Sequence, residues 1–300
     1  MKKAKFIINP SSGKQNFIIQ VEEVIGCLIL NQVVNQIDVV YTKHERDARI
    51  EAQKTKKGEY DFLVAVGGDG TTCDIINGVI KGHSDIPVAI LPAGITNSFA
   101  SAIGIPEANK EAFCEMILKF NTKSIDVGRA NEDYFINVLA GGFMANVVYR
   151  VDTESKIVLG KLAYLIEGAK EIPKKAFTSF RLAFESEEYN GEKDVLLFVA
   201  ANTGNIAGLK DFVPGARIDD SLLDIAIFEK MDIGELSMLL FKFLQGGHLN
   251  HSKVKYFQTK KINIHEFTKQ DIPIDCDGER YQKLPIVLEA CPKAVKIIVP

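Results

Sequence analysis

The feature that most constrains the fold of this chain is an apolar, β-branched run, residues 62–66, that ends at a Gly-Gly-Asp-Gly-Thr sequence at residues 67–71. Beyond it, apolar side chains recur at positions 75, 76, 79 and 80, which is helical spacing. This order predicts a buried strand, a tight turn and then a helix. Such units build α/β folds, in which helices cover a sheet of parallel strands.

The glycine-rich turn also indicates a phosphate site. Backbone N–H groups at a helix N-terminus point outward, and the helix dipole favours an anion there. Glycines let the main chain approach a phosphate closely. A carboxylate would repel the phosphate itself, so Asp69 makes sense beside a divalent cation. A tight βα turn alone would need one or two glycines rather than three around an acid, so we predict a nucleotide-phosphate site at Gly67, Gly68, Asp69, Gly70 and Thr71.

Strand and helix patterns alternate through the first part of the chain. We expect strands at 5–9, 38–41, 62–66 and 87–91, and helices at 17–30, 47–56, 71–81 and from about residue 96. This alternation predicts a parallel sheet with helices on both faces. Ligands of such sheets bind at the carboxyl ends of the strands, where Asn9, Thr42, Gly67 and Gly94 fall.

After about Asp126 the pattern changes to short alternating or β-branched runs separated by turn residues, which is typical of an antiparallel β-sandwich or barrel. The expected strands are 134–138, 179–185, 195–200, 223–228, 253–257, 261–265 and 295–299, with helical insertions at 158–170 and 232–245. We therefore predict two domains, an α/β nucleotide-binding domain at 1–127 and a β-sandwich domain at 128–300.

Composition excludes several classes of function. A length of 300 residues favours two domains, and a net charge of −3 provides no basic field for nucleic acid. The first apolar stretch is too short for a secretory signal, and no run approaches the roughly 18 residues that cross a bilayer. The five cysteines are odd in number and scattered, as expected for free thiols in a reducing compartment. We expect a cytoplasmic protein.

A series of motifs runs in a fixed order from about residue 5 to 285. They are Asn9–Gly13, Gly67–Thr71 with Asn77-Gly78, Pro92–Asn97, Ile125–Gly128, Leu159–Tyr164, Pro214–Asp220, Leu222–Asp224 and Asp275–Glu279. With this order and spacing the chain resembles the bacterial lipid kinases that carry the diacylglycerol kinase catalytic domain, relatives of the sphingosine kinases. The glycine turn alone is shared with NAD kinases and phosphofructokinases, so the later motifs make the resemblance specific.

The resemblance implies a two-domain enzyme with ATP in the cleft between an α/β domain and a β-sandwich. Carried over by motif, the nucleotide site would consist of Asn9, Thr42, Gly67, Gly68, Asp69, Gly70, Thr71, Thr72, Cys73, Gly94, Thr96 and Asn97. Asp69 and Asp126 would belong to the carboxylate network around the nucleotide-bound Mg²⁺. A second, structural Mg²⁺ would be held by Asp220 and the main-chain carbonyls of Arg217 and Leu222.

The resemblance also assigns the catalytic base to residues 277–279. Asp277 and Glu279 flank a glycine, and this spacing directs both carboxylates to one side of an extended strand or to one turn. A partly desolvated carboxylate beside another acid suits a general base. We predict that Asp277 is the base and that Glu279 supports it. The alternative is an acidic surface hairpin, because Asp-Gly is a common turn dipeptide.

Besides Asp74, a shorter acid where the family usually has Glu, three residues depart from the family pattern. Ile95 stands where the family has a threonine hydroxyl at the nucleotide, Ser98 replaces an acid of the Mg²⁺ network, and Ser221 replaces a glycine after the second acid of the structural metal motif. These changes point to altered metal or nucleotide use or to reduced activity, without by themselves indicating a dead enzyme.

We predict an ATP- and Mg²⁺-dependent lipid kinase that phosphorylates a hydroxyl of diacylglycerol or a related lipid at the inner face of the membrane. One alternative is a kinase of a soluble acceptor such as NAD or a sugar, and another is a non-catalytic regulator that binds lipid or nucleotide. The apolar stripe of residues 233–244 fits a helix packed on the sandwich or one that touches lipid. A homodimer is one possible assembly of the chain.

Overall fold

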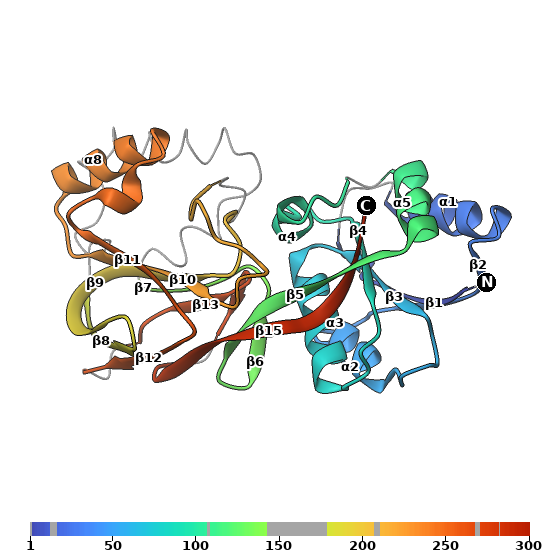
Figure 1. Cartoon of the computed structure of the whole chain (residues 1–300), viewed down its shortest axis with the longest axis horizontal. Coiled ribbons are helices and arrows are strands. Elements are labelled where there is room, and N and C mark those ends of the chain that lie inside the picture. Colours follow the sequence, from blue (N-terminus) through green and yellow to red (C-terminus); the bar gives the residue numbers. More distant parts are fainter. Residues whose placement is uncertain are drawn as a thin grey trace. The chain divides into compact units, whose positions relative to one another are not determined.

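The computed structural model describes residues 2–12, 17–106, 109–142, 179–206, 211–267, 271–281 and 283–300. The chain divides into two compact units, Met1–Val127 together with Pro292–Pro300, and Gly128–Cys291. The expected helix 158–170 and the Leu159–Tyr164 motif lie outside the described residues. Figure 1 labels the elements of both units.

The first unit is built on a parallel sheet. Its strands are β1 (Lys2–Ile8), β2 (Val34–Tyr41), β3 (Phe62–Gly67) and β4 (Val88–Pro92), and its helices are α1 (Phe17–Leu30), α2 (Asp47–Lys54), α3 (Asp69–Lys81), α4 (Ser98–Ala102) and α5 (Lys110–Lys119). The strand order is β4-β3-β1-β2, with every pair parallel. In Figure 1, α1 and α5 lie on one side of the strands and α2 and α3 on the other. The predicted α/β fold with a parallel sheet is confirmed.

Burial explains why β3 forms the middle of this sheet. All six of its residues are buried, as expected for a strand covered on both faces. On one of those faces α2 and α3 approach closely, because α3 carries Gly78 at the crossing. A Cβ atom at Gly78 would lie 2.3 Å from the carbonyl oxygen of Arg49. A glycine is therefore required for this helix pair to pack as it does.

Two long strands, β5 (Asn121–Ala130) and β15 (Ile286–Val299), contribute residues to both units. The first part of β15 pairs antiparallel with β12 of the second unit, while Ile297 pairs parallel with Val88 of β4. Residues 295–299 were expected as an antiparallel strand of the second domain. They belong instead to the first unit, where Ile297 and Ile298 are fully buried.

The second unit is antiparallel. Its strands are β6 (Asp133–Phe135), β7 (Val138–Gly142), β8 (Phe180–Ser186), β9 (Asn190–Ala201), β10 (Leu223–Glu229), β11 (Val254–Thr259), β12 (Lys261–Glu266), β13 (Ile274–Cys276) and β14 (Glu279–Arg280), with α8 (Ile233–Leu244) and a 3₁₀ turn, η2 (His248–Asn250). The order is β14-β13-β7-β9-β8-β12-β15, and β10 lies between β9 and β11. This antiparallel β-rich unit confirms the predicted second fold class.

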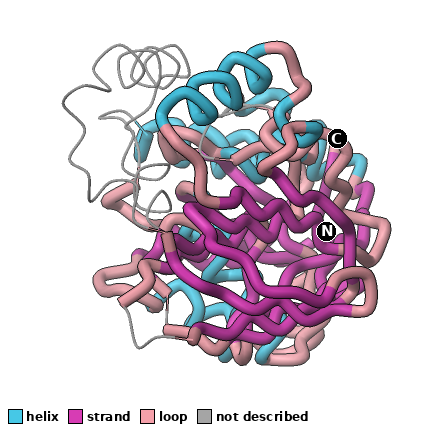
Figure 2. The backbone as a smooth tube through the Cα atoms, turned by 90° about the vertical axis from the view of Figure 1, so that its left-hand side faces the viewer, coloured by secondary structure: helices cyan, strands magenta, loops and turns pink. Residues whose placement is uncertain are grey.

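Alternation along the strands divides the second unit into two apolar layers. Phe198 and Ala200 of β9 belong to one buried cluster together with Phe184, Ile225 and Ile264. We call this cluster the inner core. Leu197, Val199 and Ala201 belong to the other cluster, which includes Leu239 of α8. We call this cluster the helix-covered face. Figure 2 shows α8 lying over the strands of this unit.

Candidate active site

The carboxyl ends of the parallel strands bring several predicted nucleotide residues together. Ile8 lies in register with Tyr41 and Val66, so the residues that follow these strands meet at one edge of the sheet. Main-chain bonds hold that edge: Thr42 donates its N–H to the Ile8 carbonyl at 2.9 Å, and Asn9 donates to the Val66 carbonyl at 3.0 Å. Asn9, Thr42 and the glycine turn therefore share one edge, as expected from the strand order.

At that edge α3 begins directly at the glycine turn. Gly68 is extended and precedes Asp69, the first residue of the helix. The first N–H groups of any helix have no acceptor inside it, and here they belong to residues 69–71. The Asn9 side-chain amide donates to the Thr71 hydroxyl at 3.2 Å, and the Thr72 hydroxyl donates to the Gly68 carbonyl at 3.1 Å. This is a helix N-terminus suited to a phosphate.

The loop after β4 lies directly against the glycine turn. A Cβ atom at Gly94 would lie 2.5 Å from the Cα of Gly68, so the two loops touch through backbone alone. The Asn97 side chain closes the loop, since its Oδ1 accepts from the Gly94 N–H at 3.0 Å and its Nδ2 donates to the Gly94 carbonyl at 2.8 Å. Both predicted residues, Gly94 and Asn97, therefore shape the backbone beside α3. The Ile95 side chain is 62% exposed.

The Asp69 carboxylate joins the two loops. It accepts hydrogen bonds from the N–H groups of Ser98 and Phe99, each at 2.9 Å, and from the Thr96 hydroxyl at 3.4 Å. Its nearest partners are thus the first residues of α4. From the sequence, Asp69 is expected only beside a cation, and this capping contact is not predicted. Ser98, where the family pattern has an acid, contributes its backbone N–H here.

Asp126, the other acid expected near the nucleotide-bound cation, is buried in β5. Its Oδ1 accepts the N–H of Lys293 at 2.7 Å, which fastens β5 to β15. Asp69 and Asp126 therefore accept hydrogen bonds from different segments of the first unit.

Asp277, the predicted base, is buried and is surrounded by main-chain donors. Its Oδ1 accepts the N–H groups of Asn137 and Val138 at 2.9 Å each, and its Oδ2 accepts that of Ile136 at 2.6 Å. The predicted strand 134–138 is broken between β6 and β7, because these three N–H groups bind a carboxylate instead of a neighbouring strand. Glu279, the predicted supporting acid, lies exposed on β14.

Asp275, two residues earlier, was not singled out from the sequence. It is buried on β13, and burial raises the pKa of its carboxyl to about 7, with further increases from the charges of Asp277 and Glu279. A hydrogen bond from the Gly278 N–H at 2.8 Å acts in the opposite direction on this pKa. The missed signal was an acid between Ile274 and Cys276, two strand neighbours that pack toward the inner core.

A second acidic group surrounds Asp220 and Asp224. Asp220 accepts the Leu222 N–H at 3.0 Å, and Asp224 accepts the Tyr256 hydroxyl at 2.5 Å. Asp224 is fully buried, and its Oδ2 accepts no hydrogen bond from the part of the chain that the structure describes. Burial raises the pKa of the Asp224 carboxyl, the Tyr256 bond lowers it, and the charge of Asp220 raises it.

The acids around Asp220 carry oxygen ligands of the kind that bind a metal ion. An orphan buried carboxylate oxygen beside a second carboxylate is the donor chemistry that Mg²⁺ takes, completed by carbonyls and waters. Asp220 and Asp224 therefore have the donor chemistry that the expected second cation needs, whereas the Arg217 guanidinium is exposed and pairs with Asp219 at 3.0 Å. The described residues contain no group of three or more His, Cys, Asp or Glu side chains that could hold a metal ion.

Ser221 adopts a left-handed backbone conformation, with φ of 65°. This is the position where the family pattern has glycine, and the conformation explains that preference, because a left-handed φ is strained for residues with a Cβ atom.

Comparisons with known proteins agree with this architecture. Residues 3–130 match the diacylglycerol kinase catalytic domain, and residues 137–299 match the YegS C-terminal NAD kinase beta sandwich-like domain. A protein named diacylglycerol kinase from Staphylococcus haemolyticus is 33% identical over 284 residues, which cover 95% of this chain and 84% of that relative. One with the same name from Staphylococcus aureus is 32% identical, covering 95% and 88%.

Solved structures show the same fold. A putative diacylglycerol kinase from Bacillus anthracis has a TM-score of 0.81 at 24% identity, covering 99% of this chain and 95% of that one. The fold and the two matched domains place this chain in the class of two-domain kinases. The chain belongs to the diacylglycerol kinase family, which confirms the predicted resemblance. None of the helices that the structure describes is long and apolar enough to span a bilayer.

Proposed function

We propose that this chain is a lipid kinase that transfers the γ-phosphoryl group of ATP to a hydroxyl of diacylglycerol or a related lipid. The observation that carries the proposal is the 33% identity to a protein named diacylglycerol kinase over 95% of the chain, together with a glycine turn that opens α3. Phosphoryl transfer needs mainly positioning, charge neutralisation and a base for the attacking hydroxyl.

In this proposal the first unit binds the nucleotide. The helix N-terminus at residues 69–71 would receive phosphate oxygens, and the touching glycines 68 and 94 would let both loops approach the nucleotide without side chains. Asn9, Thr42, Thr96 and Asn97 would line the site. A bound Mg²⁺ would neutralise phosphate charge, and Asp69 and Asp126 would belong to the carboxylate network around it.

The second unit would supply the groups for the acceptor. We propose that Asp275 takes the proton of the attacking hydroxyl, because a base with a pKa near 7 is matched to neutral pH. Asp277, whose two oxygens already accept three main-chain N–H groups, would position the strand ends around it. Its assignment as the base stays a prediction, and a direct comparison of the two variants decides between them.

Asp220, with the carbonyls of Arg217 and Leu222, is proposed to hold a second cation, and the orphan Oδ2 of Asp224 supports this placement. The lipid acceptor implies a protein that works at the inner face of the membrane as a peripheral enzyme.

The test is transfer of labelled γ-phosphate from ATP with Mg²⁺ to a panel of lipids in mixed micelles, alongside NAD and sugars. Labelled lipid from the intact protein, lost in Asp69→Ala and Asp275→Asn variants that keep their melting temperature, supports the proposal. Labelled NAD or sugar without labelled lipid selects a kinase of a soluble acceptor. Nucleotide-induced thermal stabilisation without any product selects a regulator, and Ile95 and Ser98 are then the first residues to revert.

A further inference from the structure

Helix α8 presents two apolar side chains to solvent. Gly234, Met238, Phe241 and Gln245 are exposed at spacings of four, three and four residues, and so lie along one side of the helix. Met238 is 53% exposed and Phe241 is 56% exposed. The solvent face of a helix in a water-soluble domain normally carries charged and polar side chains. Here its central residues are a thioether and an aromatic ring.

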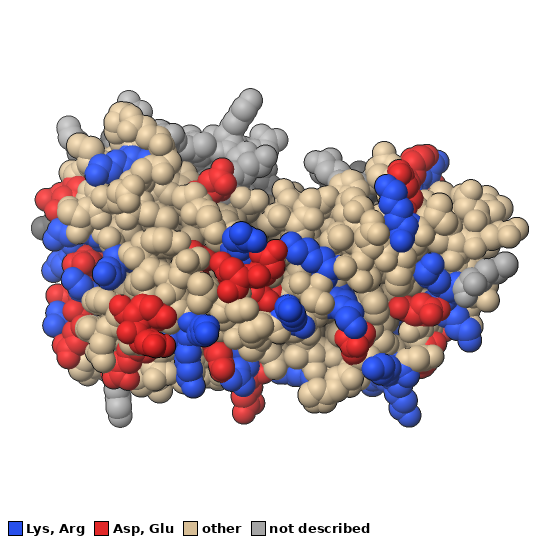
Figure 3. All heavy atoms as spheres, viewed as in Figure 1, with Lys and Arg blue, Asp and Glu red and all other residues tan. Residues whose placement is uncertain are grey.

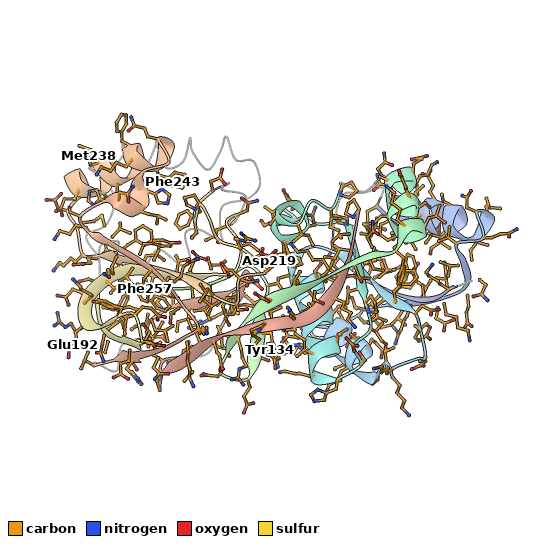
Figure 4. All side chains as sticks on the ribbon, viewed as in Figure 1. Tyr134, Glu192, Asp219, Met238, Phe243 and Phe257 are labelled. Atoms are coloured by element: carbon orange, nitrogen blue, oxygen red, sulfur yellow. The ribbon has the colours of Figure 1, made fainter. Side chains whose placement is uncertain are left out.

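The opposite side of α8 is firmly packed. Leu239 is buried in the helix-covered face, and the Phe243 ring lies 5.6 Å from that of Phe212 and 4.7 Å from that of His248. Figure 4 labels Met238 and Phe243 on this helix. The packing of Leu239 and Phe243 on this side leaves Met238 and Phe241 on the side of α8 that faces solvent.

The acids of α8 are engaged at its first turn. Asp232 and Glu235 form a capping box, in which each carboxylate accepts the backbone N–H of the other residue, at 2.8 and 2.9 Å. Three lysines lie in the same stretch of chain, at positions 230, 242 and 253, whereas Lys255 lies over the Tyr189 ring on the inner-core side of β11. The segment is therefore basic overall, and the surface over α8 is mostly uncharged in Figure 3.

The helix also lies on the same side of the sheet as the buried acid proposed to act on the acceptor. Asp275 is opposite Ala140 in the β13–β7 register, and directly opposite residues of an antiparallel pair share a face. Ala140 belongs to the helix-covered face, whereas the neighbouring Leu139 belongs to the inner core. The acceptor chemistry and α8 thus share one face of the second unit.

We propose that the exposed face of α8 inserts Met238 and Phe241 into the surface of a bilayer containing anionic lipid, so that the protein meets its acceptor from this side. The inference rests on the proposed lipid kinase function. Shallow insertion of an amphipathic helix needs only apolar side chains on a polar support with basic residues nearby. A second copy of the chain is a poorer occupant, because two side chains offer far less than the roughly 800 Å² per partner of a specific interface.

The first experiment is co-sedimentation of the full-length protein with vesicles of phosphatidylcholine and phosphatidylglycerol. We expect the Met238→Gln/Phe241→Gln variant to lose at least about tenfold in vesicle partitioning, because two half-exposed apolar side chains no longer insert. The matched control is Ile29→Gln/Leu30→Gln, which removes exposed apolar side chains of α1, and it should partition like the original protein. Equal partitioning of both variants, or no binding by the original protein, overturns the proposal.

The second experiment uses the absence of tryptophan from the chain. Phe241→Trp introduces a single reporter on α8, and Leu30→Trp introduces one on α1 as the control. On adding vesicles we expect a blue shift, and quenching by lipids brominated on their acyl chains, for the α8 reporter only. Quenching of the α1 reporter alone would place the lipid surface elsewhere and overturn the proposal.

Two further readouts separate this inference from the proposed function. Phosphorylation of a short-chain diacylglycerol dispersed as monomers tests the kinase without a bilayer, and its failure in the original protein rejects the function whatever the vesicles show. Given that activity, the ratio of vesicle-borne to dispersed turnover should fall in the α8 variant and not in the α1 control. A dimer that becomes monomeric on the α8 substitution in sedimentation equilibrium would assign the face to a second copy instead.

Discussion

Three acidic side chains within five residues, Asp275, Asp277 and Glu279, have three different surroundings. The first is buried with one main-chain donor, the second is buried with three, and the third is exposed. Spacing alone groups Asp277 with Glu279, as a pair around a glycine. Their surroundings instead separate Asp277, whose carboxylate holds three main-chain N–H groups, from Asp275, whose carboxyl has one such contact and a raised pKa.

Replacement of Asp275 by asparagine should abolish most of the transfer activity while the fold is kept. The amide retains an oxygen for the Gly278 N–H but cannot accept the acceptor's proton, so we expect kcat to fall by about 10²- to 10⁴-fold. The measurement is lipid phosphorylation under saturating ATP, with the melting temperature followed in parallel. Activity within threefold of the original protein would remove Asp275 from the mechanism.

The raised pKa of Asp275 also predicts that the free energy of unfolding depends on pH. The pKa of Asp275 is raised to about 7 from a usual value of 3.8, so between these pH values the folded protein binds a proton that the unfolded chain does not. The Asp275 contribution to stability is therefore present at low pH and is lost as the pH rises toward 7.

Urea unfolding at pH 5 and pH 8 checks this sign. The free energy of unfolding of Asp275→Asn, relative to the original protein, should increase from pH 5 to pH 8, by at most about 1.4 kcal/mol for each pH unit up to 7. The exposed Glu132→Gln serves as the control and should show no such trend. A relative stability of Asp275→Asn that decreases with pH would contradict the burial argument.

Asp277→Asn should instead lower stability. An amide nitrogen would face at least one of the N–H groups of residues 136–138, which leaves a buried donor unpaired at a cost of about 2–3 kcal/mol. Thermal unfolding beside Glu279→Gln, an exposed position expected to change stability by less than about 0.5 kcal/mol, measures the difference. An unchanged melting temperature for Asp277→Asn would show that the three contacts contribute little.

At the scale of elements, two helices carry a glycine in mid-sequence for different reasons. A Cβ atom at Gly78 of α3 would meet the Arg49 carbonyl, whereas one at Gly26 of α1 would meet nothing within 4 Å. Gly26→Ala should stabilise the protein by about 0.5–1 kcal/mol through helix propensity. Gly78→Ala should destabilise it by roughly 1–3 kcal/mol through overpacking. Denaturant midpoints compare the two directly, and the same sign for both would refute the packing argument.

Much of the element order follows from hydrophobic periodicity, because α1, β3 and α3 have long, strongly patterned sequences. Helix α5 and strands β5, β13 and β14 were not predicted. The strands β13 and β14 have only three and two residues, whereas α5 and β5 have ten residues each. The break between β6 and β7 depends on a carboxylate about 140 residues away, which local pattern does not contain. Likewise the glycine turn was found from sequence, but the Asp69 contact to α4 needed the fold.

At the scale of the whole molecule, the two ends of β15 should have separable effects. Ile297 is fully buried in the first unit, and Val287 is 37% exposed in the second. Ile297→Ala should cost about 2–5 kcal/mol, whereas Val287→Ala should cost under about 1 kcal/mol. Hydrogen exchange should then increase in β3 and β4 for the first variant only. Faster exchange confined to the second unit would contradict the strand assignment.

The membership of Pro292–Pro300 in the first unit has a consequence for how the protein is made. Domains usually fold as they leave the ribosome, the N-terminal one first. Here the first unit lacks the strand beside β4 until residues 292–300 have been translated, more than 160 residues after Val127. The β4 edge stays unpaired while the second unit is synthesised, so the nucleotide binding proposed for the first unit should mature only once residues 292–300 have been made.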